Sequence, residues 1–498
     1  METHYDICII GSGPAGLASL SCIQEDYSID VLSDTQTIRA NKHIRQNRQS
    51  KRVCVVDPNP LWLSQWENNF QTLDISFLRS PASAHCSYFD RNALIAYAIS
   101  ERREDELFDS GISEIKSLNG TVLPQIGAWK LPSTKLFIDF SRSLAKSLSH
   151  EYYQGNVVGI QKEDPHDETA PFRIELDTSD EIISAKSVIL ATGTCGNPII
   201  PQSVSNAPPS RIFQWQQLDL ALSTLKKSSG NKSKQILVIG GGLTAVQTAH
   251  KIARSTRSNG QVGAKVILCS RKDLVERHFD IPVKWFDERE ARIHQSQFYY
   301  EPKEQRLEAL KATRGGGTVP PLYMNMTRNM ERNGLLSRKI GDLSIVKEND
   351  DGSMIVRVTK KREKKEYEEF EVEAIVCACG MQPNCLSHPL VQMIHMQLPV
   401  DIFGGFPVIT AELRWAENLY VVGGLASLSV GPDAGNLMGI SRAAEAVANE
   451  LNSKQWIRGE DSNVLSNPFD MLGYDTDSSS EDEEYDETFG RSIEILVQ

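Results

Sequence analysis

The sequence predicts an α/β fold with two parallel sheets flanked by helices. An apolar strand, a glycine-rich turn and a helix-forming stretch follow one another at residues 5–20, and the same series returns at residues 234–253. Strand-like and helix-like segments alternate between and after them, as in doubly wound sheets. Both turns have the spacing G-x-G-x-x-G/A, the fingerprint of Rossmann-like dinucleotide-binding domains. We therefore expect two such domains in the 498-residue chain.

Composition excludes several classes of protein. Hydrophobic residues make up 40% of the chain and charged residues 24%, which is ordinary for a globular protein. No apolar run approaches the ~20 residues of a membrane helix, and the first strand leaves no room for a signal peptide. The nine cysteines lie mostly in apolar runs without a C-x-x-C pair. This pattern predicts reduced thiols in the cytoplasm and neither a redox disulfide nor a metal site.

The negative charge of the chain is concentrated near its C-terminus. Residues 459–488 contain eleven acidic residues and no basic ones, whereas the whole chain has a net charge of −12. The rest is nearly neutral, so no nucleic-acid partner is expected. We predict a disordered acidic tail at 457–498 that binds a basic partner or is phosphorylated at Ser478, Ser479 and Ser480, with a plain solubilising tail as the alternative.

The first glycine turn is typical of a site for a dinucleotide. Gly11 permits the tight turn, Gly13 leaves room for a pyrophosphate, and Gly16 lets the helix pack close to the strand. Pro14 and Ala15 open the helix, whose N-terminus faces the phosphates.

The next buried strand ends in Asp57, the acid that we expect to bind the adenosine ribose. Such an acid normally lies about 20 residues beyond the glycines. Here it lies 41 residues beyond Gly16, which a surface insertion at 25–52 explains. The insertion includes "IRANKHIRQNRQSKR", a solvated loop or, alternatively, a basic partner patch. Asp34 is the rival candidate for the ribose.

Later segments are expected to pass close to the same cofactor. A buried strand ends in Ala191, Thr192 and Gly193, whose small side chains allow close approach. Near the C-terminus a strand leads into a glycine turn with Gly424 and a helix that begins at about residues 434–439. Trp66 is a further candidate contact, with a core position as the alternative.

The second turn contains Gly240, Gly242, Thr244 and Ala245. The strand after it, "AKVILCSR", ends in Ser270 and Arg271 rather than in an acid. A hydroxyl and a guanidinium suit the 2′-phosphate of NADP, so we predict NADPH rather than NADH, with an exposed surface arginine as the alternative.

We expect an FAD-binding domain at 1–205 and 373–456, with an NADPH-binding domain inserted at 206–372. Two dinucleotide sites in one chain imply hydride transfer between the two cofactors. Residues 272–339 look irregular, and the loops at 58–90 and 275–330 are expected to line the substrate pocket. The sequence does not identify the substrate.

Several stretches together carry a family resemblance. Besides the two glycine turns they are "SFLRSPASAHCSYFDRNALIAY", "LPSTKLFIDF", "ATG" and "GPDAGNLMGISRAA". The chain resembles the flavin-dependent N-hydroxylating monooxygenases that act on lysine or ornithine. The resemblance implies that NADPH reduces FAD, that a C4a-hydroperoxide forms with O2, and that oxygen passes to a nucleophilic nitrogen or sulfur of a small substrate.

The resemblance also implies roles for single residues. Asn436 and Leu437 match the stretch that lies against the flavin. Arg79 matches a basic residue that binds the substrate carboxylate, with a structural salt bridge as the alternative. His85 is a candidate hydrogen-bond donor to the flavin, with a core or surface histidine as the alternative.

The chain departs from the family at Gln214, where related monooxygenases carry a histidine in a short motif. This change leaves open an NADPH-dependent flavin reductase or oxidase without oxygen insertion. A non-catalytic flavoprotein regulator or scaffold is a further alternative.

Overall fold

The computed structural model describes residues 2–25, 51–110, 115–116, 122–123, 130–164, 166–227, 235–255, 265–285, 288–314, 316–360 and 366–458. The acidic tail with its three serines, the rival acid Asp34 and nearly all of the basic insertion lie outside these residues. What the sequence predicts for them stays a prediction.

The first sheet is built around β1 (Glu2–Ile10), which pairs in parallel with β2 (Val53–Asp57) and β10 (Ser179–Leu190). Its order is β23-β24-β10-β1-β2-β7, and β9 and β8 continue from β10. The remaining strands are β7 (Glu151–Gln154), β8 (Val157–Lys162), β9 (Phe172–Leu176), β23 (Arg414–Ala416) and β24 (Leu419–Val421). Since β24 comes from the end of the chain, this sheet joins N-terminal and C-terminal segments, as predicted.

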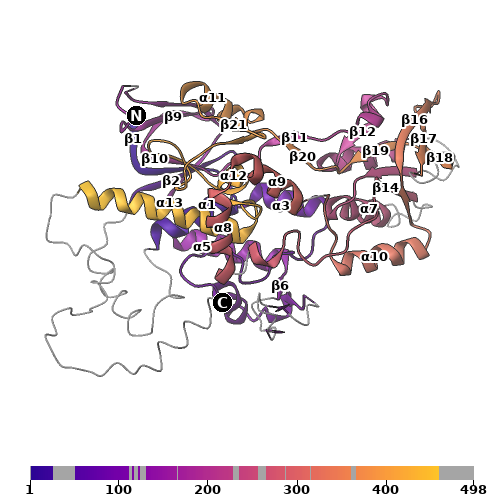
Figure 1. Ribbon diagram of the computed structural model, residues 1–498, viewed down its shortest axis with the longest axis horizontal. Helices are drawn as coiled ribbons and strands as arrows, with labels where there is room; N and C mark the ends of the chain where they lie inside the picture. Colours follow the sequence, from indigo (N-terminus) through magenta and orange to yellow (C-terminus); the bar gives the residue numbers. More distant parts are fainter. Residues whose placement is uncertain are drawn as a thin grey trace. The chain divides into compact units, whose positions relative to one another are not determined.

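Three helices pack against this sheet and against one another, α1 (Pro14–Gln24), α5 (Thr134–Ser147) and α13 (Leu437–Arg458) (Figure 1). Helix α1 is buried from Ala15 to Gln24, since it contacts both β1 and α5. Helix α5 begins after Ser133, whose Oγ accepts a hydrogen bond from the Leu136 N–H at 2.9 Å. A side-chain oxygen at this position satisfies one of the free donors of the first turn.

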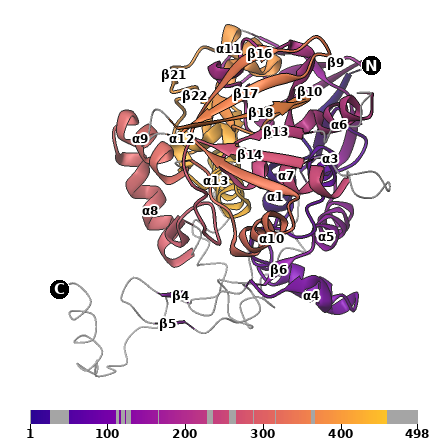
Figure 2. The ribbon, with the colours of Figure 1, turned by 90° about the vertical axis from the view of Figure 1, so that its right-hand side faces the viewer.

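The second sheet has the order β12-β19-β13-β14-β15, and all its pairs are parallel. Side chains alternate across each strand, so each face has its own partner. Ile236 and Val238 pack with α7 (Leu243–Ser255) on one face. Leu237 and Ile239 pack on the other face with the antiparallel sheet β16-β17-β18 (Figure 2). The strands are β12 (Ile212–Gln214), β13 (Gln235–Ile239), β14 (Lys265–Ser270), β15 (Leu336–Ile340), β16 (Asp342–Glu348), β17 (Met354–Thr359), β18 (Tyr367–Val372) and β19 (Ala374–Cys377).

The strand β19 lies in the second sheet and not in the first. It pairs with β12 and with β13, although the predicted boundary at residue 373 assigns it to the returning FAD domain. The chain leaves and re-enters the first domain through a short antiparallel pair, β11 (Gly196–Pro198) with β20 (Met381–Pro383). The second domain therefore extends past residue 377.

Residues 272–339 are not irregular. They contain α8 (Glu288–Tyr300), α9 (Lys303–Arg314) and α10 (Pro321–Arg332). Helices α8 and α9 contact α12 (Ser427–Val430), and a small core forms there around Trp285 and Phe298. The other helices and strands are α3 (Ser64–Thr72), α4 (Ala93–Ser100), α6 (Leu218–Lys227), α11 (Pro389–Gln397), β3 (Leu107–Phe108), β4 (Ile115–Lys116), β5 (Val122–Leu123), β6 (Leu131–Pro132), β21 (Ile402–Phe403) and β22 (Phe406–Pro407).

Within the described residues, the helices are too short or too polar to cross a membrane.

Candidate functional site

The first glycine turn has the shape of a pyrophosphate cradle. Gly11 has φ +117°, and a Cβ there would collide with the carbonyl oxygen of Ala191. A Cβ on Gly16 would collide with the carbonyl oxygen of Gly11. A Cβ on Gly13, in contrast, would meet no atom within 4 Å. The outer glycines are thus needed for packing, whereas the middle one faces the open space that a pyrophosphate requires.

Asp57 lies at the end of β2, directly beside this turn. Its Oδ2 accepts a hydrogen bond from the backbone N–H of Ser12 at 2.8 Å. Its Oδ1 accepts from the backbone N–H of Asn59 at 2.8 Å and from Asn59 Nδ2 at 2.9 Å. These bonds fix the carboxylate at the edge of the turn, where an acid that binds ribose is expected.

Two other predicted segments come to the same place. The 191–195 loop follows β10, where the Thr192 Oγ1 lies 3.9 Å from the Cys195 Sγ. A Cβ on Gly424 would collide with the Thr194 Oγ1, and a Cβ on Gly423 would lie 3.3 Å from the Cβ of Ala15. The carboxyl ends of β1, β10 and β24 therefore meet around the first turn, where parallel sheets bind ligands.

Trp66 lies on α3 and packs against other aromatic residues. Its ring stacks on Phe70 with centroids 3.7 Å apart, and the Phe137 ring lies 5.1 Å away. These contacts favour the core position among the two interpretations that the sequence left open.

In the second turn, Gly240 packs closely against neighbouring residues, and Gly242 lies against another segment of the chain. A Cβ on Gly240 would collide with the Ala378 carbonyl oxygen and would lie 2.7 Å from the Cβ of Ala245. A Cβ on Gly242 would lie 3.4 Å from the Cα of Gly317. Thr244 sits in the first turn of α7, where its carbonyl accepts a hydrogen bond from the Thr248 Oγ1 at 2.7 Å.

Ser270 and Arg271 end β14 beside this turn. The Ser270 Oγ donates a hydrogen bond to the Lys272 carbonyl at 2.7 Å. A Cβ built on Gly241 would lie 3.6 Å from the Cβ of Ser270, so Ser270 lies beside the turn. Arg271 is exposed. An exposed guanidinium next to the glycine turn fits the 2′-phosphate of NADP, since it can be reached without breaking a protein contact.

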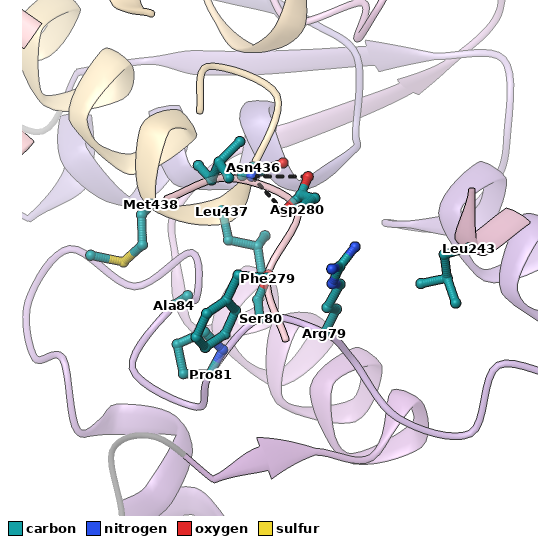
Figure 3. A pocket seen from close by; sticks show the side chains of 11 residues that line it. Arg79, Ser80, Pro81, Ala84, Leu243, Phe279, Asp280, Asn436, Leu437 and Met438 are labelled. Atoms are coloured by element: carbon teal, nitrogen blue, oxygen red, sulfur yellow. Dashed lines mark hydrogen bonds between the residues drawn. The ribbon is translucent and has the colours of Figure 1, made fainter. Parts of the chain in front are cut away.

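A cavity of about 230 Å³ lies where the two domains meet (Figure 3). The first domain contributes residues 79–84 and the start of α13, and the second contributes Leu243 and residues 279–281. Its lining is Arg79, Ser80, Pro81, Ala84, Leu243, Phe279, Asp280, Ile281, Asn436, Leu437 and Met438. The predicted residues Arg79, Asn436 and Leu437 thus come together here, and both loops expected to line a pocket do so.

Charged and polar groups in the cavity are few. Asn436 Nδ2 donates to the two carboxylate oxygens of Asp280 at 3.4 and 3.5 Å, as Figure 3 shows. The other lining residues are apolar apart from Arg79 and Ser80, so the cavity combines an apolar wall with one carboxylate and one guanidinium. Asp280 could not be predicted from the sequence, because it stands in a stretch without regular periodicity.

Arg79 makes contacts that neither predicted role describes. Its Nε donates to the His278 carbonyl at 2.6 Å, and its Nη2 donates to the Arg277 carbonyl at 2.9 Å and to the Thr318 Oγ1 at 2.8 Å. Burial lowers the pKa of the guanidinium to about 10, although the charge of Asp280 opposes this shift. The Arg79 guanidinium, which comes from the first domain, thus donates hydrogen bonds to uncharged oxygens of the second domain and joins the two domains.

His85 and Gln214 do not line the cavity. The buried His85 ring accepts a hydrogen bond from the Ser87 N–H at 3.2 Å through Nδ1, so its Nε2 donates to the Arg91 carbonyl at 2.9 Å. This favours the core histidine. Gln214 caps the short helix at 215–217, where its N–H donates to the Gln217 Oε1 at 3.0 Å.

The family model of L-lysine 6-monooxygenase/L-ornithine 5-monooxygenase matches residues 129–383, just over half of the chain. No curated protein matches.

Solved structures of similar fold cover nearly the whole chain. An ornithine N-hydroxylase from Kutzneria sp. 744 has 13% identity and a TM-score of 0.63, covering 91% of this chain and 100% of its own. A cadaverine monooxygenase from Erwinia amylovora has 14% identity and a TM-score of 0.62, covering 91% and 95%. The L-lysine 6-monooxygenase from Pseudomonas syringae has 17% identity and a TM-score of 0.59, covering 90% and 99%.

Proposed function

The chain belongs to the L-lysine 6-monooxygenase/L-ornithine 5-monooxygenase family, and on this premise we propose that it is an FAD- and NADPH-dependent monooxygenase that hydroxylates an amine nitrogen of a small molecule. The similar structures include an ornithine hydroxylase with NADP⁺ and reduced FAD, and a cadaverine hydroxylase with FAD. The observation that carries the proposal is the cavity, which is lined by both dinucleotide-binding domains.

The first domain is proposed to hold FAD. The diphosphate would lie against Gly13 and the N-terminus of α1, and Asp57 would bind the ribose. Thr192, Gly193 and Gly424 would pass beside the cofactor, and Asn436 with Leu437 would lie near its ring. Bound FAD would supply the transfer of electrons from NADPH to O2.

The second domain is proposed to hold NADPH at Gly240, Gly242, Thr244 and Ala245, with Ser270 and Arg271 at the 2′-phosphate. Arg271 selects NADPH over NADH because a guanidinium binds phosphate strongly and gains nothing from a hydroxyl.

The cavity wall is proposed to position the amine. Only an unprotonated nitrogen is nucleophilic, and the carboxylate of Asp280 can accept an N–H hydrogen bond and orient the lone pair away from itself. The apolar side chains of Phe279, Leu437 and Met438 exclude water. We also propose a cytoplasmic location, which is supported by nine free cysteines, eight of them buried.

The test uses the FAD-loaded protein with NADPH and ¹⁸O₂, offered lysine, ornithine or cadaverine in turn. We expect one of these amines to raise NADPH consumption and to yield a hydroxylamine that contains one ¹⁸O atom. If every amine left the NADPH consumption unchanged and all reducing equivalents appeared as H2O2, the chain would be an oxidase and the proposal would be wrong.

A further inference from the structure

The two glycine turns differ at their second glycine. A Cβ on Gly13 would point into open space, with no atom within 4 Å. A Cβ on Gly242, at the equivalent place in the second turn, would lie 3.4 Å from the Cα of Gly317. In this type of turn the bare second glycine is where the pyrophosphate approaches the backbone. The space is open in the first domain and is filled by the protein's own chain in the second.

The segment that fills it, Gly316 and Gly317, packs backbone against backbone. Gly317 has φ +75°, and a Cβ on it would lie 2.7 Å from the Cα and 3.4 Å from the N of Gly242. The Gly316 carbonyl oxygen would lie 3.9 Å from a Cβ on Gly241. Contacts this close leave no room for a diphosphate between the two backbones. The packing also requires glycine at residue 317.

Arg79 holds this segment in place from the first domain. Its Nη2 donates to the Thr318 Oγ1 at 2.8 Å and its Nη1 to the Thr318 carbonyl at 3.4 Å. Thr318 follows Gly317 directly, and the next residue is paired with the chain at 275–277 through two backbone hydrogen bonds of 2.9 and 3.0 Å. The same guanidinium binds the carbonyls of Arg277 and His278. The Arg79 side chain therefore anchors both residues 277–278 and residue 318, the two stretches of chain at the base of the segment.

We propose that residues 316–318 form a lid on the second glycine turn, that Arg79 is a positioning residue that latches the lid, and that NADPH binds after the lid has moved off Gly242. This inference rests on the proposed NADPH site. With such a lid, the apparent affinity for the dinucleotide is the intrinsic affinity multiplied by the fraction of molecules in which the lid is open. Opening also changes the contacts of Arg79, which lines the cavity, so dinucleotide binding alters the wall that meets the substrate.

The test is a gain of affinity. In a Gly317→Ala protein the added Cβ collides with Gly242 only when the lid is closed, so the open form is favoured. We expect the Kd for NADP⁺, measured by calorimetry on the FAD-loaded protein, to fall at least fivefold. The matched control is Gly334→Ala, since Gly334 has φ +69° but a Cβ there meets nothing within 4 Å. This control bears the same backbone strain without touching the lid, and its Kd should equal that of the wild type.

A second variant and a second probe separate the possible failures. An Arg79→Met protein lacks the latch and should also bind NADP⁺ more tightly, whereas a merely structural arginine would leave the Kd unchanged or raise it. Adenosine 2′-monophosphate carries no pyrophosphate, so its Kd should be the same in all variants. If NADP⁺ bound Gly317→Ala no more tightly than Gly334→Ala, the proposal of a lid would be refuted, whereas the proposed NADPH site would be retained. If neither probe bound any variant, the NADPH site itself would be refuted and the lid with it.

Discussion

Replacing Gly13 by leucine should remove FAD and leave the fold intact. Residue 13 has φ −75° and ψ −175°, an extended conformation that any residue adopts. A Cβ there meets no atom within 4 Å. We therefore expect the free energy of unfolding of the cofactor-free protein to fall by no more than about 1 kcal/mol, the cost of an apolar residue at the N-cap of α1.

The leucine side chain would stand in the space that the diphosphate needs. If FAD loses two hydrogen bonds from backbone N–H groups to its phosphates, each worth about 1.5–3 kcal/mol with a charged acceptor, its binding weakens by about 3–6 kcal/mol. This corresponds to a Kd that is roughly 10²–10⁴ times higher.

The assay compares the FAD content of the purified proteins, the Kd for FAD from flavin fluorescence, and the urea unfolding curves of both cofactor-free forms. The control is Gly11→Ala, which combines a φ of +117° with a collision at the Ala191 carbonyl and should lose stability as well as FAD. A Gly13→Leu protein that purified with one FAD per chain would refute the placement of the diphosphate at this turn.

Three further predictions concern charged and titratable side chains. Arg271→Ala should raise the Kd for NADPH about 10–100-fold, the worth of one charged hydrogen bond, and leave that for NADH unchanged; equal losses in calorimetry would contradict the assignment. Arg442 donates to the Trp285 carbonyl at 2.7 Å and to the buried carboxylate of Asp433. Arg442→Met leaves that carboxylate unpaired and should lower the free energy of unfolding, measured by urea titration, by about 3–5 kcal/mol. Adding Asp433→Asn should recover part of the lost stability. Burial lowers the pKa of His250, whose Nε2 donates to the Thr327 Oγ1 at 2.9 Å, to about 4, so the unfolded chain binds more protons than the folded one between about pH 4 and 6.5. As the pH falls through that window, the wild type should therefore lose up to about 3 kcal/mol of stability relative to His250→Gln. Parallel pH profiles of the two proteins would contradict this.

Local patterns predicted the parts of the fold that depend on local chemistry. The strand, turn and helix around Gly11–Gly16 could be predicted because they are contiguous in the chain, and Asp57 was proposed because it ends the next buried strand. The strand β19 was assigned to the wrong sheet for the opposite reason. A fully buried strand is apolar on both faces in either sheet, so its residues do not say which strand lies beside it.

The same limit applies to the site. The family resemblance placed Arg79 at a predicted substrate pocket. Its partners are backbone carbonyls and a threonine about 200 residues away, and no spacing rule connects them. The glycines at 316–317 look like an ordinary turn in the sequence. Only the fold brings them against Gly242. Helices α8 and α9 were missed because they carry few apolar residues, and both contact α12, from a distant part of the chain.

The difference between the two turns agrees with how long each cofactor is expected to stay bound. FAD remains bound through many reaction cycles in an enzyme of this kind, so an open cradle at Gly13 favours it without a competing contact. NADPH must bind and NADP⁺ must leave in every cycle. A lid on Gly242 weakens both by the same factor, because the diphosphate is common to the two forms. A Gly317→Ala enzyme that binds both more tightly should therefore have a lower KM for NADPH. Since the lid is open in every molecule that holds the dinucleotide, the gain lies in the association rate, and kcat should stay unchanged even where release of NADP⁺ limits turnover. A variant whose kcat changed together with its KM would show that the lid also acts on the dinucleotide-bound form, and the exclusion of the lid from the bound state would be wrong.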